Sequence, residues 1–243
     1  MRFFVDKEEV SFFQSHGWLE LETGPFTPFL QEIILWLESI MDRAALKVDV
    51  GMWSLGRDLW RQEKQLDHFL RNPLWSQIFS TLSQKKTIRL GLDMCFTTQI
   101  KGACVEEVLF PLEEKHSIKN LLGGVLFCCK PKLRVIFLAA NLVLSDDLEE
   151  VLYVSPTEEE TVPQLYYFLG LTSAISQYQP VAKDPFRDWL KTLGIVVGGT
   201  LTDKTHPILC RSQILSDKAY VVARPYPNLF FLMKGFFTTR NGA

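Results

Sequence analysis

The fold is predicted first from the opening stretch Phe4–Leu21, which reads FVDKEEVSFFQSHGWLEL. Asp6 followed three residues later by Glu9 is a capping pattern, in which each side chain accepts a backbone N–H at the start of a helix. Apolar residues then recur at helical spacing until Gly17, a residue type that commonly ends helices. Residues 18–22 alternate apolar and acidic side chains, which predicts a short strand with one buried face.

The rest of the chain is predicted to begin with helices and to continue with strands. Helices are expected from Thr27 to about Leu46, over Asp58–Arg71, and from Asn72 to just before Lys85. Strands are expected at Thr87–Thr98, Gly124–Cys129, Leu133–Leu138, Ile195–Val197, His206–Gln213, Ala219–Ala223 and Leu229–Met233. Two further helices are expected, one starting at Gln164 and a short one from Asp184 to Leu193. Early helices and later strands predict one α+β domain over residues 1–243, with helices on one side of a largely antiparallel sheet.

The composition disfavours several classes of protein. Hydrophobic residues make up 47% of the 243 residues and charged residues 22%, which is globular rather than disordered. The formal net charge is −2, whereas non-specific nucleic-acid binders usually carry a basic surplus, so nucleic acid is disfavoured as a partner. No apolar stretch reaches about 18 residues, so no membrane-spanning helix is expected. No other partner is indicated.

The cysteines favour a reducing compartment. There are five, and no C-x-x-C pair occurs among them. The adjacent Cys128 and Cys129 lie in a predicted strand, where neighbouring side chains point to opposite faces. We therefore expect them to pack as small apolar groups rather than to form a disulfide. The N-terminus has no signal-peptide pattern, so the expected location is the cytoplasm.

Common catalytic motifs are absent from the sequence. It contains no P-loop, no G-x-G-x-x-G, no G-x-S-x-G and no H-E-x-x-H. None of the four histidines is followed two residues later by Asp or Glu. No catalytic residue is therefore assigned, no metal site is expected, and the sequence favours a protein that is not an enzyme.

Two histidines remain as the candidates for metal ligands. His116 follows a run of charged residues and is expected on a loop surface. His206 lies between a polar turn and an apolar strand. The other two have simpler interpretations: His16 is expected to face free carbonyls at the end of the first helix, and His68 to be solvated.

A cluster of basic residues is interpreted as a solvated helix face. Four of them fall partly along one predicted helix: Arg57, Arg61, Lys64 and Arg71. Acidic residues are interleaved with them, which disfavours a nucleic-acid-binding surface. Three tryptophans around this helix are expected to dock the helical layer on the sheet rather than to stack on bases: Trp53, Trp60 and Trp75.

The opening stretch resembles the start of phytanoyl-CoA-hydroxylase-type Fe(II)/2-oxoglutarate oxygenases. That family often begins with a capped helix, a Phe-Phe pair, a glycine and an aromatic-led strand, here Phe12, Phe13, Gly17 and Trp18. Its layout of helices followed by many short strands is also similar. The resemblance implies a double-stranded β-helix core, of the jelly-roll or cupin-like type, flanked by N-terminal helices.

The residues that carry this family's chemistry are only partly matched. The family holds iron with an H-x-D/E…H triad and binds 2-oxoglutarate through a later arginine. This chain lacks the H-x-D/E element, although His206 stands where the distal histidine is expected. Arg211 is too near for the arginine and Arg224 is somewhat far. The resemblance therefore implies a degenerate version of the fold, with no cofactor expected and Fe(II) and 2-oxoglutarate indicated by fold analogy only.

Three hypotheses follow, in this order. The first is a cytoplasmic protein with an oxygenase-like fold but no iron triad, a pseudoenzyme that binds a ligand or has a non-standard activity. The second is a divalent-cation (iron)-responsive transcriptional regulator, suggested by a resemblance to a chlamydial protein. Against it, the chain lacks the clustered ligands and the basic recognition helix of the ferric uptake regulator family. The third is an active non-haem iron oxygenase with atypical ligands around His116 and His206.

Overall fold

The computed structural model describes residues 5–21, 23–24, 27–98, 105–130, 132–142, 148, 152 and 164–211. Its centre is an eight-stranded sheet in the order β1-β6-β5-β7-β4-β3-β2, with β8 paired to β4. Every pairing is antiparallel. The strands are β1 (Trp18–Leu21), β2 (Lys47–Val50), β3 (Trp53–Arg57), β4 (Thr87–Thr98), β5 (Ile118–Lys130), β6 (Arg134–Ala139), β7 (Gln164–Tyr178) and β8 (Ile208–Arg211).

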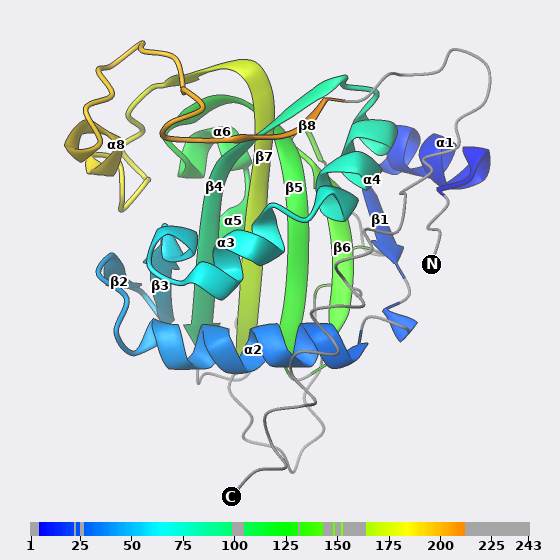
Figure 1. Cartoon of the computed structure of the whole chain (residues 1–243), viewed down its shortest axis with the longest axis horizontal. Helices are drawn as coiled ribbons and strands as arrows, with labels where there is room; N and C mark the ends of the chain where they lie inside the picture. The colour runs from blue at the N-terminus through cyan, green and yellow to red at the C-terminus, as the bar shows by residue number, and fades with distance from the viewer. Residues whose placement is uncertain are drawn as a thin grey trace, which may run out of the picture.

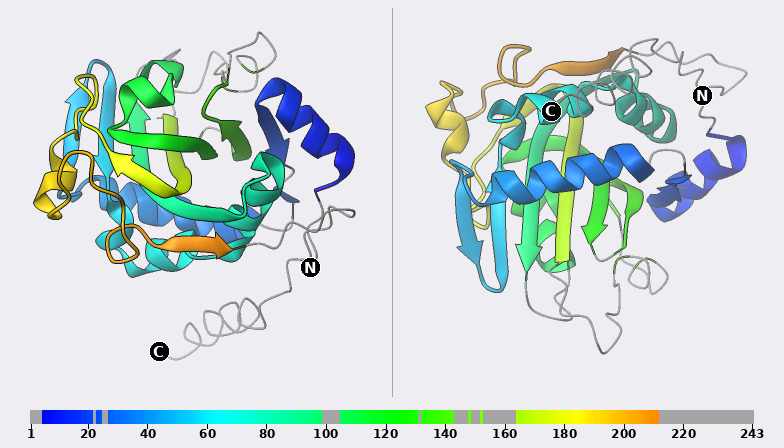
Figure 2. Two further views of the ribbon diagram at one scale, coloured as in Figure 1. Left: turned by 90° about the horizontal axis from the view of Figure 1, so that it is seen from above. Right: turned by 60° about the horizontal axis from the view of Figure 1, so that its bottom comes forward.

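Helices cover one face of this sheet, as Figure 1 shows. They are α1 (Lys7–His16), α2 (Thr27–Met41), the 3-10 turn η2 (Leu59–Arg61), α3 (Lys64–Leu70) and α4 (Pro73–Ser83). Both views in Figure 2 show the same layered arrangement, with α2 lying across the strands. Apolar residues of these helices form one continuous core with the facing side of β4–β7. The prediction of an α+β chain with an antiparallel sheet is confirmed. The helices are not confined to one side, because three short ones pack on the other face.

The opening helix forms as its sequence predicts. The Asp6 side chain accepts the backbone N–H of Glu9, and the Glu9 side chain accepts that of Asp6, both at 2.8 Å. Gly17 ends the helix with φ +78°, a left-handed conformation that favours glycine. The strand that follows, β1, pairs with β6 at the edge of the sheet. His16 faces the helix end as predicted, with Nδ1 3.0 Å from the Phe12 carbonyl oxygen.

The second core lies on the other face of the sheet. It joins Phe96, Leu126 and Phe168 to the short helices α5 (Glu106–Leu109), α6 (Leu112–Lys115) and α8 (Trp189–Thr192). The two adjacent cysteines confirm the prediction of opposite faces, because Cys129 belongs to the helix-side core and Cys128 to this one. The four cysteines within the described part are buried.

The prediction of a helix from Gln164 is wrong. Residues 164–178 form β7, the strand between β4 and β5 near the centre of the sheet. Its first nine residues are all buried, since both faces of the sheet are covered. A strand covered on both faces has a continuous apolar run rather than an alternating one, and such a run does not distinguish a strand from a helix.

Other differences concern the boundaries of elements. The helix predicted over Asp58–Arg71 is divided into η2 and α3, because Glu63 between them takes an extended backbone conformation, φ −130° and ψ 115°. The predicted strand Ile195–Val197 is a turn and irregular chain. The hairpin of β2 and β3 was not predicted. Two predicted strands, Ala219–Ala223 and Leu229–Met233, lie outside the described residues.

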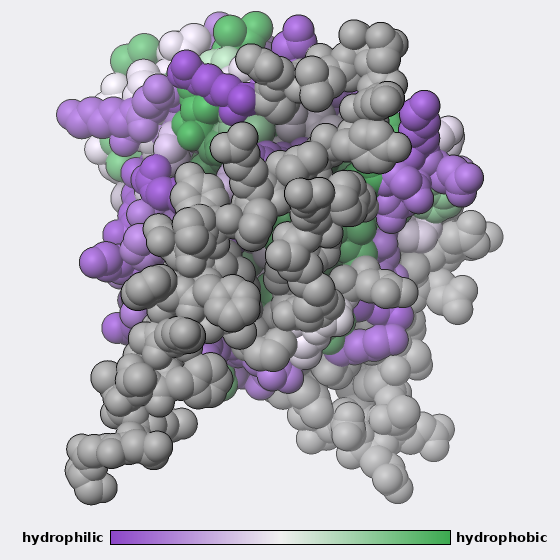
Figure 3. Space-filling view, turned by 45° about the vertical axis from the view of Figure 1, so that its right-hand side comes forward, coloured by the Kyte–Doolittle hydropathy of each residue, from purple (hydrophilic) through white to green (hydrophobic). Residues whose placement is uncertain are grey.

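The surface of the described part is mixed in character. Among the residues that are coloured in Figure 3, hydrophilic ones predominate and hydrophobic ones gather in smaller areas. The most exposed large apolar side chains are Ile175 and Val196, at 73% and 71%. Among the described residues, no helix is both long enough and apolar enough to span a membrane.

Candidate functional site

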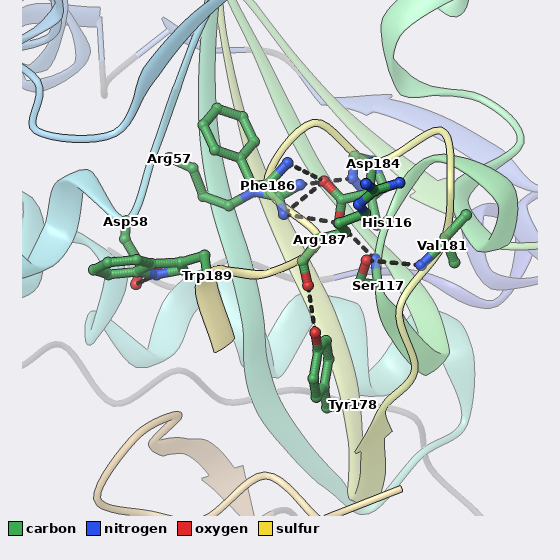
Figure 4. A network of polar contacts seen from close by, with 10 residues as sticks. All are labelled: Arg57, Asp58, His116, Ser117, Tyr178, Val181, Asp184, Phe186, Arg187 and Trp189. Atoms are coloured by element: carbon green, nitrogen blue, oxygen red, sulfur yellow. Dashed lines mark hydrogen bonds and ion pairs between the residues drawn. The ribbon is translucent and has the colours of Figure 1, made fainter. Parts of the chain in front are cut away.

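A buried ion pair joins two distant parts of the chain at the end of β3. Arg57 is the last residue of β3, and its Nη1 lies 3.1 Å from both carboxylate oxygens of Asp184. Arg57 is 6% exposed and Asp184 1%. One face of the guanidinium lies 4.7 Å from the centre of the Phe186 ring. Figure 4 shows this network, in which the segment after β7 folds back toward β3.

Asp184 is held as a carboxylate by its surroundings. Burial alone would raise its pKa, but the charge of Arg57 and the hydrogen bonds it accepts outweigh burial, so the pKa lies below its usual range. Those bonds come from the backbone N–H groups of Ser117 at 2.8 Å and Phe186 at 2.9 Å. The Asp184 carboxylate therefore connects three parts of the chain: the end of β3, the start of β5 and the loop after β7.

His116 belongs to the same network, so its predicted position on a loop surface is wrong. It is 2% exposed, because α6 presents the preceding charged residues outward and leaves His116 at the base of β5. Its Nδ1 lies 3.0 Å from Nη2 of Arg57. A guanidinium can only donate, so Nδ1 is the acceptor and the ring proton is on Nε2. Burial, reinforced by the charge of Arg57, lowers the pKa of His116 to about 3, so the imidazole is neutral at physiological pH.

A cavity of about 200 Å³ opens beside Arg57 and His116. Its walls are mostly apolar. The other lining residues are the buried Arg57 and His116 and three more exposed charged residues, Glu107, Lys115 and Lys183, which we call its mouth. The lining consists of Val50, Gly51, Met52, Trp53, Leu55, Arg57, Met94, Glu107, Val108, Lys115, His116, Lys183 and Pro185. Pockets of this kind, apolar with a few convergent polar groups, are the usual form of small-molecule sites.

The lysines at the mouth of the cavity already have partners. Lys183 Nζ lies 2.6 Å from the Glu114 carboxylate, and Lys115 Nζ donates to the Glu107 carbonyl at 2.7 Å. Lys183 and Glu114 are both more than half exposed, so their pairing is screened by water. The mouth therefore carries both signs of charge rather than an excess of one.

A second buried polar cluster lies behind the ion pair. Asp58, the neighbour of Arg57, accepts from Arg61 Nε at 2.8 Å and from Trp189 Nε1 at 2.5 Å. Asp93, on β4, accepts from the Tyr167 hydroxyl at 3.0 Å and from the backbone N–H of Trp60 at 3.2 Å. Burial, together with the nearby charge of Asp58, raises the pKa of Asp93 to about 7.

His206, the other candidate ligand, belongs to this second cluster. It is 2% exposed, and burial lowers its pKa to about 4, with Asp58 acting in the opposite direction. Its backbone carbonyl accepts a hydrogen bond from Arg89. His116 and His206 are therefore surrounded by different groups, and the fold does not bring them together at one site.

The described residues do not fit an iron triad. No three His, Cys, Asp or Glu side chains within the described ranges are placed to hold a metal ion. His116 has Nδ1 occupied as an acceptor, and a guanidinium lies beside it, which repels a second cation. His206 is accompanied by Arg61 and Arg89. For the chain as a whole, the absence of catalytic and metal-ligating residues remains a prediction.

The pair at the centre of this site was missed at the level of sequence. From the sequence, Arg57 is expected on a solvated basic face, and Asp184 is expected to start a short helix. The two residues are 127 positions apart, so no local pattern joins them. The signal that was available is chemical: Asp184 precedes Pro185, and Asp before Pro is typical of a turn in which the carboxylate accepts nearby backbone N–H groups.

Comparison with known proteins identifies the fold. No family model matches the chain, and no curated protein matches it in sequence. Among solved structures, the chain is similar to the non-heme alpha ketoglutarate dependent epimerase SnoN from nogalamycin biosynthesis, with TM-score 0.54 and 14% identity over 82% of this chain and 96% of that one. SnoN in complex with Fe3+, alpha ketoglutarate and nogalamycin RO matches with TM-score 0.54 and 13% identity, over the same shares of the two chains.

The carbocyclase SnoK of the same biosynthesis has TM-score 0.49 and 13% identity, over 84% of this chain and 96% of that one. The likeness to SnoN shows that the chain has a 2-oxoglutarate-oxygenase-like, cupin-related fold, as the resemblance of the opening stretch implies. The chlamydial resemblance finds no support in these comparisons. The finer jelly-roll description stays a prediction.

Proposed function

We propose that this chain is a small-molecule-binding protein built on an oxygenase-like scaffold, and that it does not use the iron and 2-oxoglutarate chemistry associated with that scaffold. The binding site is the cavity at the end of β3. The observation that carries the proposal is the position of this cavity, which opens directly on the buried Arg57 and His116. The related scaffold of SnoN holds small molecules in that protein.

The polar groups at the cavity suit binding better than metal chemistry. An iron centre of this type needs imidazole and carboxylate ligands with lone pairs free to face the ion. Here Asp184 accepts from Arg57 and from two backbone N–H groups, and His116 accepts from Arg57. These bonds fix the side chains in place, which is the pre-organisation that a rigid binding site requires.

The first test measures whether the protein binds iron and consumes 2-oxoglutarate. Purified protein is incubated anaerobically with Fe(II) and 2-oxoglutarate, desalted and analysed for iron, and a second sample is assayed for 2-oxoglutarate consumption in air. We expect far less than one iron per chain and no consumption above a protein-free control. Stoichiometric iron together with turnover would contradict the proposal and favour the hypothesis of an iron oxygenase.

The second test is to fill the cavity. Val108→Trp places a large ring in the lining, and Met52→Trp does the same from the more exposed β2–β3 turn, where folding is less at risk. Val196→Trp is the matched control, because Val196 is 71% exposed and does not line the cavity. Binding of a library of single-ring compounds is followed by saturation-transfer NMR. We expect both cavity variants to lose the bound compounds and the control to keep them; equal binding by all three proteins would refute the site.

A further inference from the structure

We propose that the cavity takes an uncharged, apolar molecule of about the size of one small ring, which is held by burial of its surface and not by hydrogen bonds. This inference rests on the proposed binding function and names the class of ligand. Such a ligand differs from 2-oxoglutarate, which is a dianion. Three features of the cavity favour it: the chemistry of the walls, the pairing of the polar groups and the size of the space.

The inner wall of the cavity is part of the second core. Trp53, Leu55 and Met94 line the cavity and belong to that core, with exposed fractions of 3%, 2% and 1%. Aromatic and thioether side chains make favourable contacts with an aromatic or alkyl group. The wall therefore offers an apolar ligand the environment of a buried core side chain.

A more exposed part of the lining is apolar as well. Val50 and Met52 flank Gly51 in the turn between β2 and β3, and both side chains line the cavity. They are 44% and 40% exposed, which places them among the few exposed large apolar side chains of the described part. Exposed apolar surface that adjoins a cavity is typical of a ligand site. An apolar ligand would remove this surface from water, whereas a polar one would not benefit from it.

The buried polar groups of the lining have one another as partners. Arg57 donates to Asp184 at 3.1 Å and to Nδ1 of His116 at 3.0 Å. The nitrogens outside these bonds, Nε of Arg57 and Nε2 of His116, are buried, and the Leu109 carbonyl interacts with the His116 ring. A polar ligand would therefore lose hydrogen bonds to water on entry without replacing them, while a hydrocarbon has none to lose.

The charges at the mouth of the cavity do not favour an ion. Lys183 pairs with Glu114 at 2.6 Å, and both side chains are more than half exposed. The other two charged groups, Lys115 and Glu107, are of opposite sign, and Lys115 Nζ donates to the Glu107 carbonyl at 2.7 Å. An ion of either sign would meet charges of both signs and would give up its hydration on entry, so a neutral ligand is favoured.

The size of the cavity limits the ligand. A cavity of about 150 Å³ lined by apolar residues is known to stay dry and to bind benzene in another protein. The present cavity, at about 200 Å³, is only slightly larger. One ring with a short alkyl substituent therefore fits inside it, whereas a polycyclic molecule does not.

The test compares four probes that share one benzene ring and differ in its substituent. Ethylbenzene is neutral and apolar, benzamide is neutral with hydrogen-bonding groups, benzoate is an anion, and benzylammonium is a cation. Dissociation constants are measured by NMR titration at pH 7.5 on the full chain. We expect ethylbenzene to bind at least about tenfold more tightly than either ion and several-fold more tightly than benzamide, because it alone sacrifices no polar hydration.

Two pairs of variants locate the bound probe. Val108→Trp fills the cavity, and Val196→Trp is its control outside the lining. Met52→Gln makes the exposed part of the lining polar at nearly constant size, and Leu35→Gln is its control, because Leu35 is 65% exposed and does not line the cavity. We expect Val108→Trp to abolish ethylbenzene binding, Met52→Gln to weaken it several-fold, and both controls to retain it.

The outcomes separate this inference from the proposed function. Equal or tighter binding of benzamide or of an ion, still abolished by Val108→Trp, overturns the ligand class and leaves the binding site standing. Binding of ethylbenzene that neither Val108→Trp nor Met52→Gln changes overturns both. If none of the four probes binds at millimolar concentration, the ligand class is wrong, and the compound library decides the proposed function separately.

Discussion

At the scale of single residues, the Arg57–Asp184 pair is the contact on which a substitution should act most strongly. Asp184→Asn keeps the shape of the side chain but leaves a buried guanidinium without its counter-charge. Breaking a buried pair from one side typically costs about 3–5 kcal/mol. We expect a loss of that order in the free energy of unfolding, measured by urea titration.

An exposed acidic residue nearby provides the control for this substitution. Asp188 pairs with Lys191 at 2.6 Å, and both side chains are more than half exposed. Asp188→Asn should change stability far less than Asp184→Asn, because water screens the pair. Similar effects of the two substitutions would mean that the buried pair contributes no more than a surface one.

Asp93 should make the free energy of unfolding depend on pH in a direction that can be predicted. Its pKa is raised by burial to about 7 in the folded protein, from an ordinary value of 3.8. Between about pH 4 and pH 7 the folded state therefore keeps a proton that the unfolded state has lost. The contribution of Asp93 to stability is full below this window and is lost as pH rises through it, by up to about 1.4 kcal/mol per pH unit.

Asp93→Asn isolates this effect from other groups. The variant should lack the contribution of Asp93 to the free energy of unfolding, which falls as pH rises. The free energy of unfolding of the wild type minus that of the variant should therefore decrease from pH 4 to pH 7. The buried histidines act in the opposite direction, since the lowered pKa values of His116 and His206 cost stability as pH falls below about 6.5. A difference that is constant across this range would contradict an elevated pKa for Asp93.

At the scale of elements, close packing within the sheet leaves no room for a side chain at Gly124. Gly124, on β5, faces Gly170 of β7 across the ladder. A Cβ at Gly124 would lie 2.3 Å from the Leu169 carbonyl oxygen and 2.6 Å from the Phe168 ring. Gly124→Ala should therefore destabilise the protein by about 1–3 kcal/mol, the usual range for overpacking. Gly24→Ala, with no atom within 4 Å, is the control for thermal unfolding; a comparable loss there would refute the packing explanation.

The elements that were predicted well are those specified by local sequence. The Asp6–Glu9 box defines α1, and Asn72 with Pro73 defines the start of α4. β7 could not be recognised, because burial on both faces removes the alternation that identifies a strand. The ion pair and the cavity could not be predicted either, since they depend on the β3 end meeting a loop about 130 residues later.

At the scale of the whole molecule, ligands should be distinguished by their effect on thermal unfolding. A ligand at 100 times its dissociation constant stabilises the folded state by about 2.7 kcal/mol. We expect a single-ring compound that binds the cavity to raise the thermal-unfolding midpoint of the full chain when it is near saturation. Fe(II) with 2-oxoglutarate, kept anaerobic, should leave the midpoint unchanged; a shift that needs both together would indicate a working oxygenase centre.

Arg57 and Asp58 are neighbours in sequence, yet their charges serve two different buried clusters (Figure 4). If β3 slipped by a single position against β4, either Asp58 would take the place of Arg57 or Arg57 that of Asp58, so one cluster would receive a group of the wrong sign. Such a mispaired chain would bury two charges of the same sign together, which is unfavourable. The two adjacent charges of this dipeptide thus favour one register of β3 against β4.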